Sequence, residues 1–101
     1  MNSPIATLQV VELAADGSRI PTRFELGQPR PDGRGAWACH VSVDGYDRFS
    51  KDIYGEDSLQ ALCIALRLLR LHLELPLERG SRLVYPDGGG EFPLCAYFEG
   101  Y

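Results

Sequence analysis

A leucine-rich segment between Asp57 and Leu75 constrains the fold of this chain more than any other feature. Asp57 stands three residues before Gln60, which matches the capping box that begins many helices. Pro76 has no amide hydrogen and its ring clashes with the preceding turn, so we expect it to end the helix. The pattern therefore predicts a helix of about five turns over residues 57–75, in the C-terminal half of the chain.

Apolar residues occupy two sides of this predicted helix. With about 100° of rotation per residue, one leucine-rich arc should cover a sheet, and a second arc lies on the far side. The first arc consists of Leu59, Leu62, Leu66, Leu69 and Leu73, and the second of Ala61, Ile64, Leu68, Leu71 and Leu75. A helix on one sheet needs a single buried stripe, so the second arc must contact the C-terminal tail, the long loop or another molecule.

Alternating apolar residues and turn signals predict β-strands before and after the helix. The predicted strands cover residues 5–14, 19–26, 37–43, 46–53 and 81–85. Between the second and third of them, residues 27–35 are rich in Pro and Gly and lack periodicity, which indicates a loop or an irregular sheet connection. We expect a single α+β domain over residues 1–101: an antiparallel β-meander of four to five strands with one long helix packed on one face.

The C-terminal segment, residues 92–101, is aromatic rather than polar. It contains Phe92, Tyr97, Phe98 and Tyr101. Disordered tails are poor in aromatic residues, so this segment is expected to pack on the body of the domain or on a partner.

Charge and hydropathy argue against two classes of partner. The net charge of −4 and the scattered basic residues are unfavourable for nucleic acid, which requires clustered Lys and Arg. The longest leucine-rich run contains Arg67, Arg70 and Glu74, whereas a membrane span needs about 20 mostly uncharged residues. The N-terminus lacks the basic and apolar regions of a signal peptide. We therefore expect no nucleic acid and no membrane as partners.

The three cysteines predict a reducing, cytoplasmic setting. Cys39, Cys63 and Cys95 are odd in number and widely spaced, which argues against both a disulfide framework and a zinc site. Cys39 shares a strand face with apolar residues and is expected in the core, while its neighbour His40 points to the opposite face. Cys63, near the start of the helix, is the candidate reactive thiol, because the helix dipole there lowers a thiol pKa.

The remaining polar residues have structural explanations. His72 lies on the apolar half of the helix, where a histidine is usually hydrogen-bonded in a core or an interface. Its neighbours one turn away are Leu68 and Pro76, so the metal-binding spacing is missing. Asp52 and Glu56 indicate a solvated acidic turn before the helix cap. We therefore expect no catalytic residue, no metal and no cofactor.

Two segments carry a family resemblance. They are Trp37-Ala38-Cys39-His40-Val41-Ser42-Val43-Asp44-Gly45 and Tyr54-Gly55-Glu56-Asp57-Ser58-Leu59-Gln60-Ala61-Leu62. Together they resemble a family of small bacterial domains in which a Trp-x-Cys strand precedes a Gly-x-Asp-Ser-x-Gln-Ala-Leu helix start. That family has no assigned activity, so the resemblance implies a bacterial cytoplasmic setting and no catalytic residues.

The excess apolar surface favours a non-enzymatic interaction module that forms a homodimer or binds a protein partner. The candidate interface consists of Ile64, Leu68, Leu71, Leu75, Phe98 and Tyr101. One alternative is a small-ligand-binding domain or small enzyme that uses a cleft near residues 27–35, with His40, Cys63 or the acidic turn. Another is an acidic, immunity-like accessory protein that neutralises a basic partner.

Overall fold

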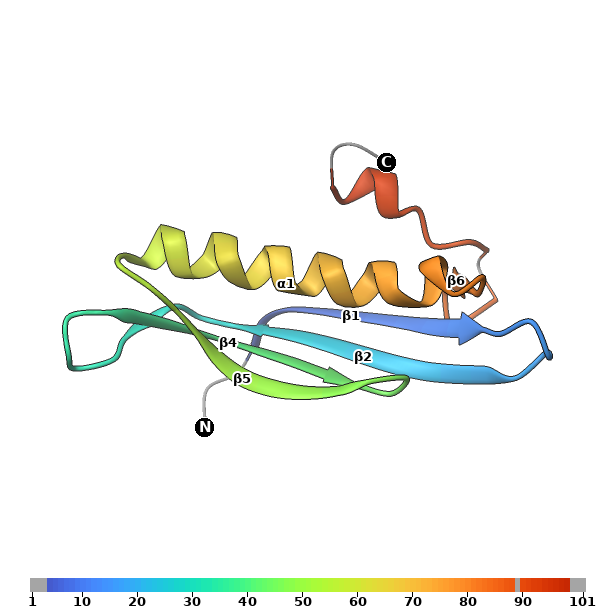
Figure 1. Ribbon diagram of the computed structural model, residues 1–101, viewed down its shortest axis with the longest axis horizontal. Helices are drawn as coiled ribbons and strands as arrows, with labels where there is room; N and C mark the ends of the chain where they lie inside the picture. Colours follow the sequence, from blue (N-terminus) through green and yellow to red (C-terminus); the bar gives the residue numbers. More distant parts are fainter. Residues whose placement is uncertain (1–3, 89, 99–101) are drawn as a thin grey trace.

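The computed structural model describes residues 4–88 and 90–98 and has an α+β fold, with one long helix lying on one face of an antiparallel sheet (Figure 1). The elements are β1 (Pro4–Leu13), β2 (Arg19–Gly27), β3 (Arg30–Pro31), β4 (Trp37–Asp44), β5 (Arg48–Gly55), α1 (Ser58–Glu78), β6 (Arg82–Val84) and the 3-10 turn η1 (Leu94–Ala96). The predicted fold class is confirmed.

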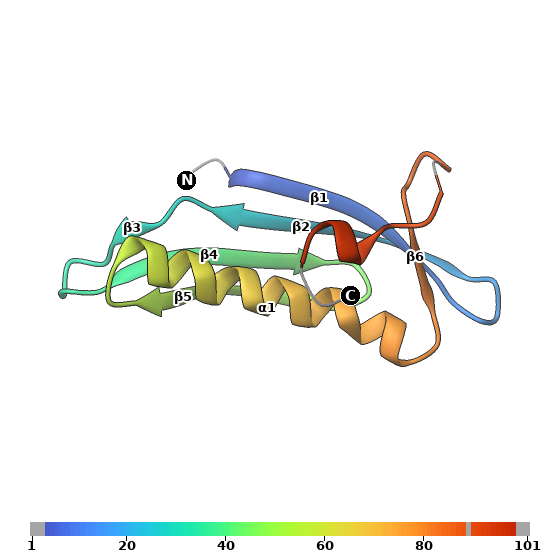
Figure 2. The same ribbon diagram turned by 90° about the horizontal axis from the view of Figure 1, so that it is seen from above.

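The sheet is antiparallel throughout. β1 pairs with β2 on one side and with the short β6 on the other, β2 and β3 both pair with β4, and β5 pairs with β4 as well. The segment predicted as a loop or irregular connection over residues 27–35 therefore contains the two-residue strand β3. In Figure 2 the helix runs along β4 and β5, so it covers only one half of the sheet.

The N-terminus of α1 agrees with the predicted capping box. Asp57 is the N-cap, and its Oδ1 accepts a hydrogen bond from the amide of Gln60 at 2.7 Å. The Gln60 side chain in turn accepts from the amide of Glu56 at 2.6 Å. Gly55 precedes this cap, and a Cβ atom there would collide with the backbone of Ala61. The missing side chain therefore lets the end of β5 approach the first turn of the helix.

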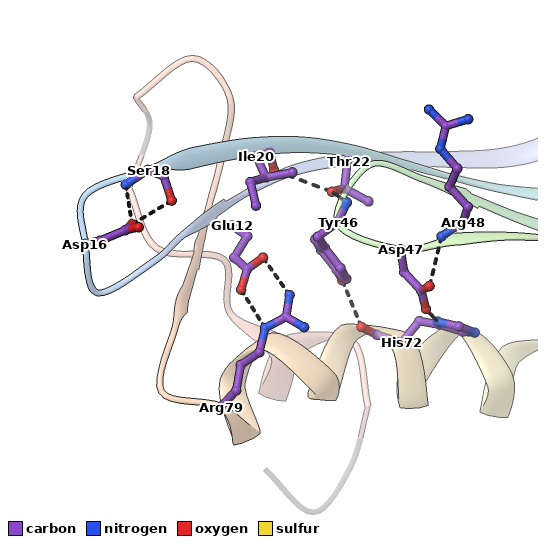
Figure 3. Close-up of polar contacts among 10 residues, drawn as sticks. All are labelled: Glu12, Asp16, Ser18, Ile20, Thr22, Tyr46, Asp47, Arg48, His72 and Arg79. Atoms are coloured by element: carbon purple, nitrogen blue, oxygen red, sulfur yellow. Dashed lines mark hydrogen bonds and ion pairs between the residues drawn. The ribbon is translucent and has the colours of Figure 1, made fainter.

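The prediction that Pro76 ends the helix is wrong, because α1 continues through Pro76 to Glu78. A proline inside a helix leaves the carbonyl four residues earlier without its amide donor, and here that carbonyl belongs to His72. The hydroxyl of Tyr46 donates to it at 2.8 Å, as Figure 3 shows. A side chain from the β4–β5 loop thus satisfies the carbonyl oxygen that the proline leaves unpaired.

The helix is also rotated relative to the predicted orientation. Leu59 was expected to face the sheet, yet it is 67% exposed. The residues that the helix buries are Ala61, Ala65, His72, Leu73 and Pro76. Alanines at the line of contact allow the helix backbone to lie close to the sheet, so the larger leucines are displaced to its two flanks.

One flank of the helix and the C-terminal segment complete the core over β1 and β2. Phe92 and Leu94 are buried in a cluster with Val10, Phe24 and Leu73. Phe98 packs against the same cluster, so this part of the aromatic segment packs on the body, one of the two possibilities the sequence left open. Tyr101 lies outside the described residues.

Replacing Tyr46 with Phe tests the hydroxyl that supports the proline-containing helix. We expect Tyr46→Phe to lower the free energy of unfolding by about 1–2 kcal/mol, because it leaves the carbonyl of His72 without this donor. Urea unfolding followed by circular dichroism measures the change. Tyr54→Phe is the matched control, since Tyr54 is 56% exposed and its loss should change stability by less than about 0.5 kcal/mol. Equal effects of the two variants would contradict the role of Tyr46.

Candidate functional site

The face of the sheet opposite the helix carries a polar network. Side chains alternate between the two faces of a strand. Every second residue therefore faces α1, and the residues between them project to the opposite, polar side. They include Arg23, Glu25, Arg30, His40, Ser42, Ser50 and Asp52. Antiparallel pairing sets His40 directly opposite Asp52 and Ser42 directly opposite Ser50.

His40 is the centre of this network. Its Nδ1 lies 2.8 Å from Oδ1 of Asp52, and its Nε2 lies 2.9 Å from Oγ of Ser50. The other carboxylate oxygen of Asp52 accepts a hydrogen bond from Arg30 at 2.7 Å. Arg30, Asp52, His40 and Ser50 therefore form one continuous chain of hydrogen bonds across β3, β4 and β5.

Within this hydrogen-bond network, Arg30 and Asp52 stabilise each other's charged form. The Arg30 guanidinium, followed by His40, lowers the pKa of the Asp52 carboxyl from its usual range. Asp52 in turn raises the pKa of Arg30. Because Asp52 stays ionised, it presents two acceptor oxygens that orient both of its partners.

Two hollows lie on this face and share part of their lining. One, of about 600 Å³, includes Arg30, His40 and Asp52. The other, of about 630 Å³, includes Arg23 and Arg48. Glu25, Ser42 and Ser50 line both hollows. Ser50 is exposed, so its hydroxyl is accessible from solvent on either side.

The outer flank of α1 is the second candidate surface. It consists of Ile64, Leu68, Leu71 and Leu75. Leu71 is 57% exposed and Leu75 is 42% exposed, whereas Ile64 and Leu68 are half-buried. The opposite flank, with Leu66 and Leu69, faces a narrow apolar groove beneath Phe98. The predicted interface is therefore divided, because Phe98 lies on the other side of the helix from Leu71 and Leu75.

A buried ion pair anchors the C-terminal end of the helix. Glu12 on β1 is 2% exposed, and its carboxylate receives two hydrogen bonds from Arg79, at 2.7 and 2.9 Å (Figure 3). The Arg79 guanidinium lowers the pKa of Glu12 and outweighs the opposing effect of burial. This pair joins the C-terminal end of the helix to β1, which is separated from β4 by β2 in the sheet, and it has a structural role.

His72, expected in a core or an interface, lies in the core. Its ring packs against Phe49 with 5.0 Å between centroids, and its Nδ1 lies 2.9 Å from Oδ2 of Asp47. Figure 3 shows that this contact comes from the same loop that supplies Tyr46. His72 therefore helps to attach the β4–β5 loop to the helix.

The cysteines occupy different environments. Cys39 is buried and donates to the carbonyl of Gly27 at 3.3 Å, and burial raises the pKa of its thiol. Cys63 and Cys95 are exposed. Across residues 4–88 and 90–98, no three His, Cys, Asp or Glu side chains gather closely enough to bind a metal ion. Nor does the described part of the chain contain a helix long and apolar enough to cross a membrane.

The network around His40 was not found from the sequence. The alternative prediction of a cleft near residues 27–35 named His40 and the acidic turn that contains Asp52, but it predicted no hydrogen bond between them and did not include Ser50. The signal that could have found them is the pairing of β4 with β5, because residue numbers that sum to 92 face one another across that hairpin. The predicted reactive thiol, Cys63, is exposed on the helix and belongs to neither hollow on the polar face.

The fold and these surfaces define a small α+β domain in which one long helix lies on an antiparallel sheet. The chain belongs to the family described as Domain of unknown function (DUF6968), which matches residues 8–95. This agrees with the resemblance to a family without an assigned activity. No curated protein and no solved structure matches the chain significantly.

The pair of Glu12 and Arg79 predicts acid sensitivity. The folded pKa of Glu12 is lowered, so its contribution to stability is complete above the unfolded value near 4.5 and is lost as the pH falls below it. At neutral pH we expect Glu12→Gln to cost about 1 kcal/mol, because water screens the half-exposed Arg79. Urea titrations between about pH 6 and pH 3 should show a smaller acid-dependent loss for the variant.

Glu91→Gln is the matched control for this titration. Glu91 pairs with Arg82 at 2.9 Å, but both side chains are more than 60% exposed. Its replacement should change stability by less than about 0.5 kcal/mol at neutral pH. A Glu12→Gln variant with the full acid dependence of the wild type would contradict the assignment to Glu12.

Thiol titration should distinguish the cysteines. In the native protein we expect Cys63 and Cys95 to react rapidly with Ellman's reagent, and Cys39 to react only after unfolding in urea. A Cys63→Ser variant should lose one of the two rapidly reacting thiols and keep the thiol that reacts only after unfolding. Rapid reaction of all three thiols in the native protein would contradict the buried position of Cys39.

Proposed function

We propose that this domain is a protein-interaction module that pairs with a second copy of itself through the outer flank of α1. The exposed positions of Leu71 and Leu75 on one side of the helix carry the proposal. The C-terminal segment packs over the opposite flank, so the described residues leave these two side chains in contact with water. Burying each of them in an interface would contribute on the order of 1.5–3 kcal/mol.

The spacing of the outer flank suits a second helix. Its four residues are separated by four, three and four positions, which is the alternation of a coiled-coil seam. Arg67 and Glu74 lie along one rim of this seam. In an antiparallel pair, Arg67 of one chain comes near Glu74 of the other, and opposite charges at such rim positions favour the pairing. The flank is therefore complementary to itself.

The open edge of β5 contributes less to this pairing than the helix does. The described strands pair with β5 along β4 alone, so its other edge is available for strand addition. Lys51, however, lies on the helix-facing side of β5, with its Nζ 5.6 Å from the centre of the Phe49 ring. Charged residues on an edge strand, and inward-pointing lysines in particular, oppose edge-to-edge pairing. We therefore assign the contact to the helix flank.

The same proposal includes the cellular setting. Two exposed thiols without a disulfide partner suit a reducing cytoplasm, and a bacterial source follows from the resemblance of the strand and helix-start motifs. A net charge of −4 favours a protein partner over nucleic acid.

Substitution of the outer flank tests the homodimer. We expect the wild type to show twice the mass of one chain by sedimentation equilibrium, and Leu71→Glu to raise the dissociation constant by about 30-fold or more, because a carboxylate would replace a central apolar contact. Leu77→Glu is the matched control, since Leu77 is 40% exposed but lies on a different side of the helix. Its dissociation constant should remain within about threefold of the wild type.

Two results would overturn the proposal. One is a wild-type protein that stays monomeric up to millimolar concentration. The other is an equal weakening by Leu71→Glu and Leu77→Glu, which would mean that the contact does not involve the outer flank. Circular dichroism of each variant verifies that the comparison is made between folded proteins.

A further inference from the structure

We propose that Ser50 is a nucleophile on the helix-free face of the sheet, with His40 as its general base and Asp52 and Arg30 as positioning residues. The substrate class is a small carboxylic ester with an anionic group. The inference is independent of the proposed dimer, because the network lies on the opposite side of the sheet from α1.

The order of the hydrogen bonds determines the direction of proton transfer. Asp52 has a lowered pKa and is an acceptor only, so the proton between it and His40 resides on Nδ1 of the imidazole. Nε2 then carries a lone pair, and the Ser50 hydroxyl 2.9 Å away donates to it. A hydroxyl that donates to an oriented imidazole has the arrangement of an activated nucleophile.

The sheet holds these groups in place. His40 and Asp52 are a directly opposed pair in the middle of two strands that are paired along eight residues each. Arg30 binds the second oxygen of Asp52, so the carboxylate cannot rotate without losing this bond. Reactive groups on strands are positioned more accurately than groups on loops.

The two hollows determine what can reach the hydroxyl. Ser50 lines both of them, so a ligand can extend from it in either direction. Arg48 lies in one hollow with its side chain 90% exposed and only a 3.9 Å contact to Asp44. Arg23, in the same hollow, is bound to Glu25 at 2.7 Å. The Arg48 guanidinium is therefore the group that would bind a carboxylate or phosphate of the substrate.

The reaction balances with water as the only co-reactant. Oγ of Ser50 bonds to the ester carbonyl carbon and its proton moves to Nε2 of His40. The ester C–O bond breaks, and the leaving alkoxide takes this proton. Water then attacks the acyl-serine with His40 as base, which releases the carboxylic acid and restores the hydroxyl. Both hollows are open to solvent, so water is not excluded from the reacting groups and their electrostatic stabilisation is weak. We therefore expect esters with good leaving groups to react fastest.

A fluorophosphonate probe tests the nucleophile directly. Ser50 should form an Oγ–P bond as the P–F bond breaks, with fluoride leaving and the serine proton passing to His40. Peptide mapping by mass spectrometry should locate the label on Ser50. Ser58→Ala is the matched control, because Ser58 is an exposed serine that lines neither hollow and its loss should leave labelling unchanged. His40→Gln should slow labelling by about 100-fold or more.

A second measurement does not depend on replacing His40. In the Ser50→Cys variant, the imidazole should favour the thiolate, so iodoacetamide should alkylate position 50 at least about tenfold faster than position 42 in Ser42→Cys. Equal alkylation rates, a label on Ser42 as often as on Ser50, or no label on Ser50 would each overturn the proposal and leave the network a purely structural one. Leu71→Glu should label like the wild type, which separates this inference from the dimer.

Discussion

The hydrogen bond from the Tyr46 hydroxyl to the carbonyl of His72 is the contact on which the rest of the architecture depends. It permits a proline inside the last turns of α1, and the continued helix brings Arg79 to the buried carboxylate of Glu12. Tyr46 is itself held by Thr22, whose hydroxyl accepts from the Tyr46 amide at 2.9 Å. Loop, helix and sheet therefore support one another, and loss of the half-buried Tyr46 hydroxyl should weaken all three contacts.

The way in which the helix is attached to the sheet also determines which of its sides pack in the core and which remain exposed. Ala61 and Ala65 lie against the sheet, so the leucines divide between two flanks. The flank that contains Leu66 and Leu69 is covered by the C-terminal segment through contacts such as that of Phe98 with the core. The outer flank has Leu71 and Leu75 exposed, and this asymmetry is the physical basis of the proposed homodimer.

The two proposed sites use the two faces of one sheet. Apolar residues on the helix side supply the core and the association surface, while the same strands project His40, Ser50 and Asp52 to the opposite side. Because successive side chains of a strand point to opposite faces, one sheet separates the association surface from the polar network without an additional domain. A dimer formed by helix flanks would leave the polar face open, so association and a reactive serine are compatible in one molecule.

Local sequence by itself determined every strand except the two-residue β3, together with the Asp57 cap and the α+β class, because alternation and capping act over a few neighbouring residues. Tertiary structure decided the end and rotation of the helix, since the donor to His72 and the contact with the sheet come from distant segments. It also decided the polar network. A two-residue turn at Asp44-Gly45 would have set His40 opposite Phe49, whereas the observed loop pairs Asp44 with Arg48 and brings His40 to Asp52. A change of one residue in the length of a turn exchanges the two faces of the strand that follows it, and in the observed, longer loop Tyr46 contacts both Thr22 and His72.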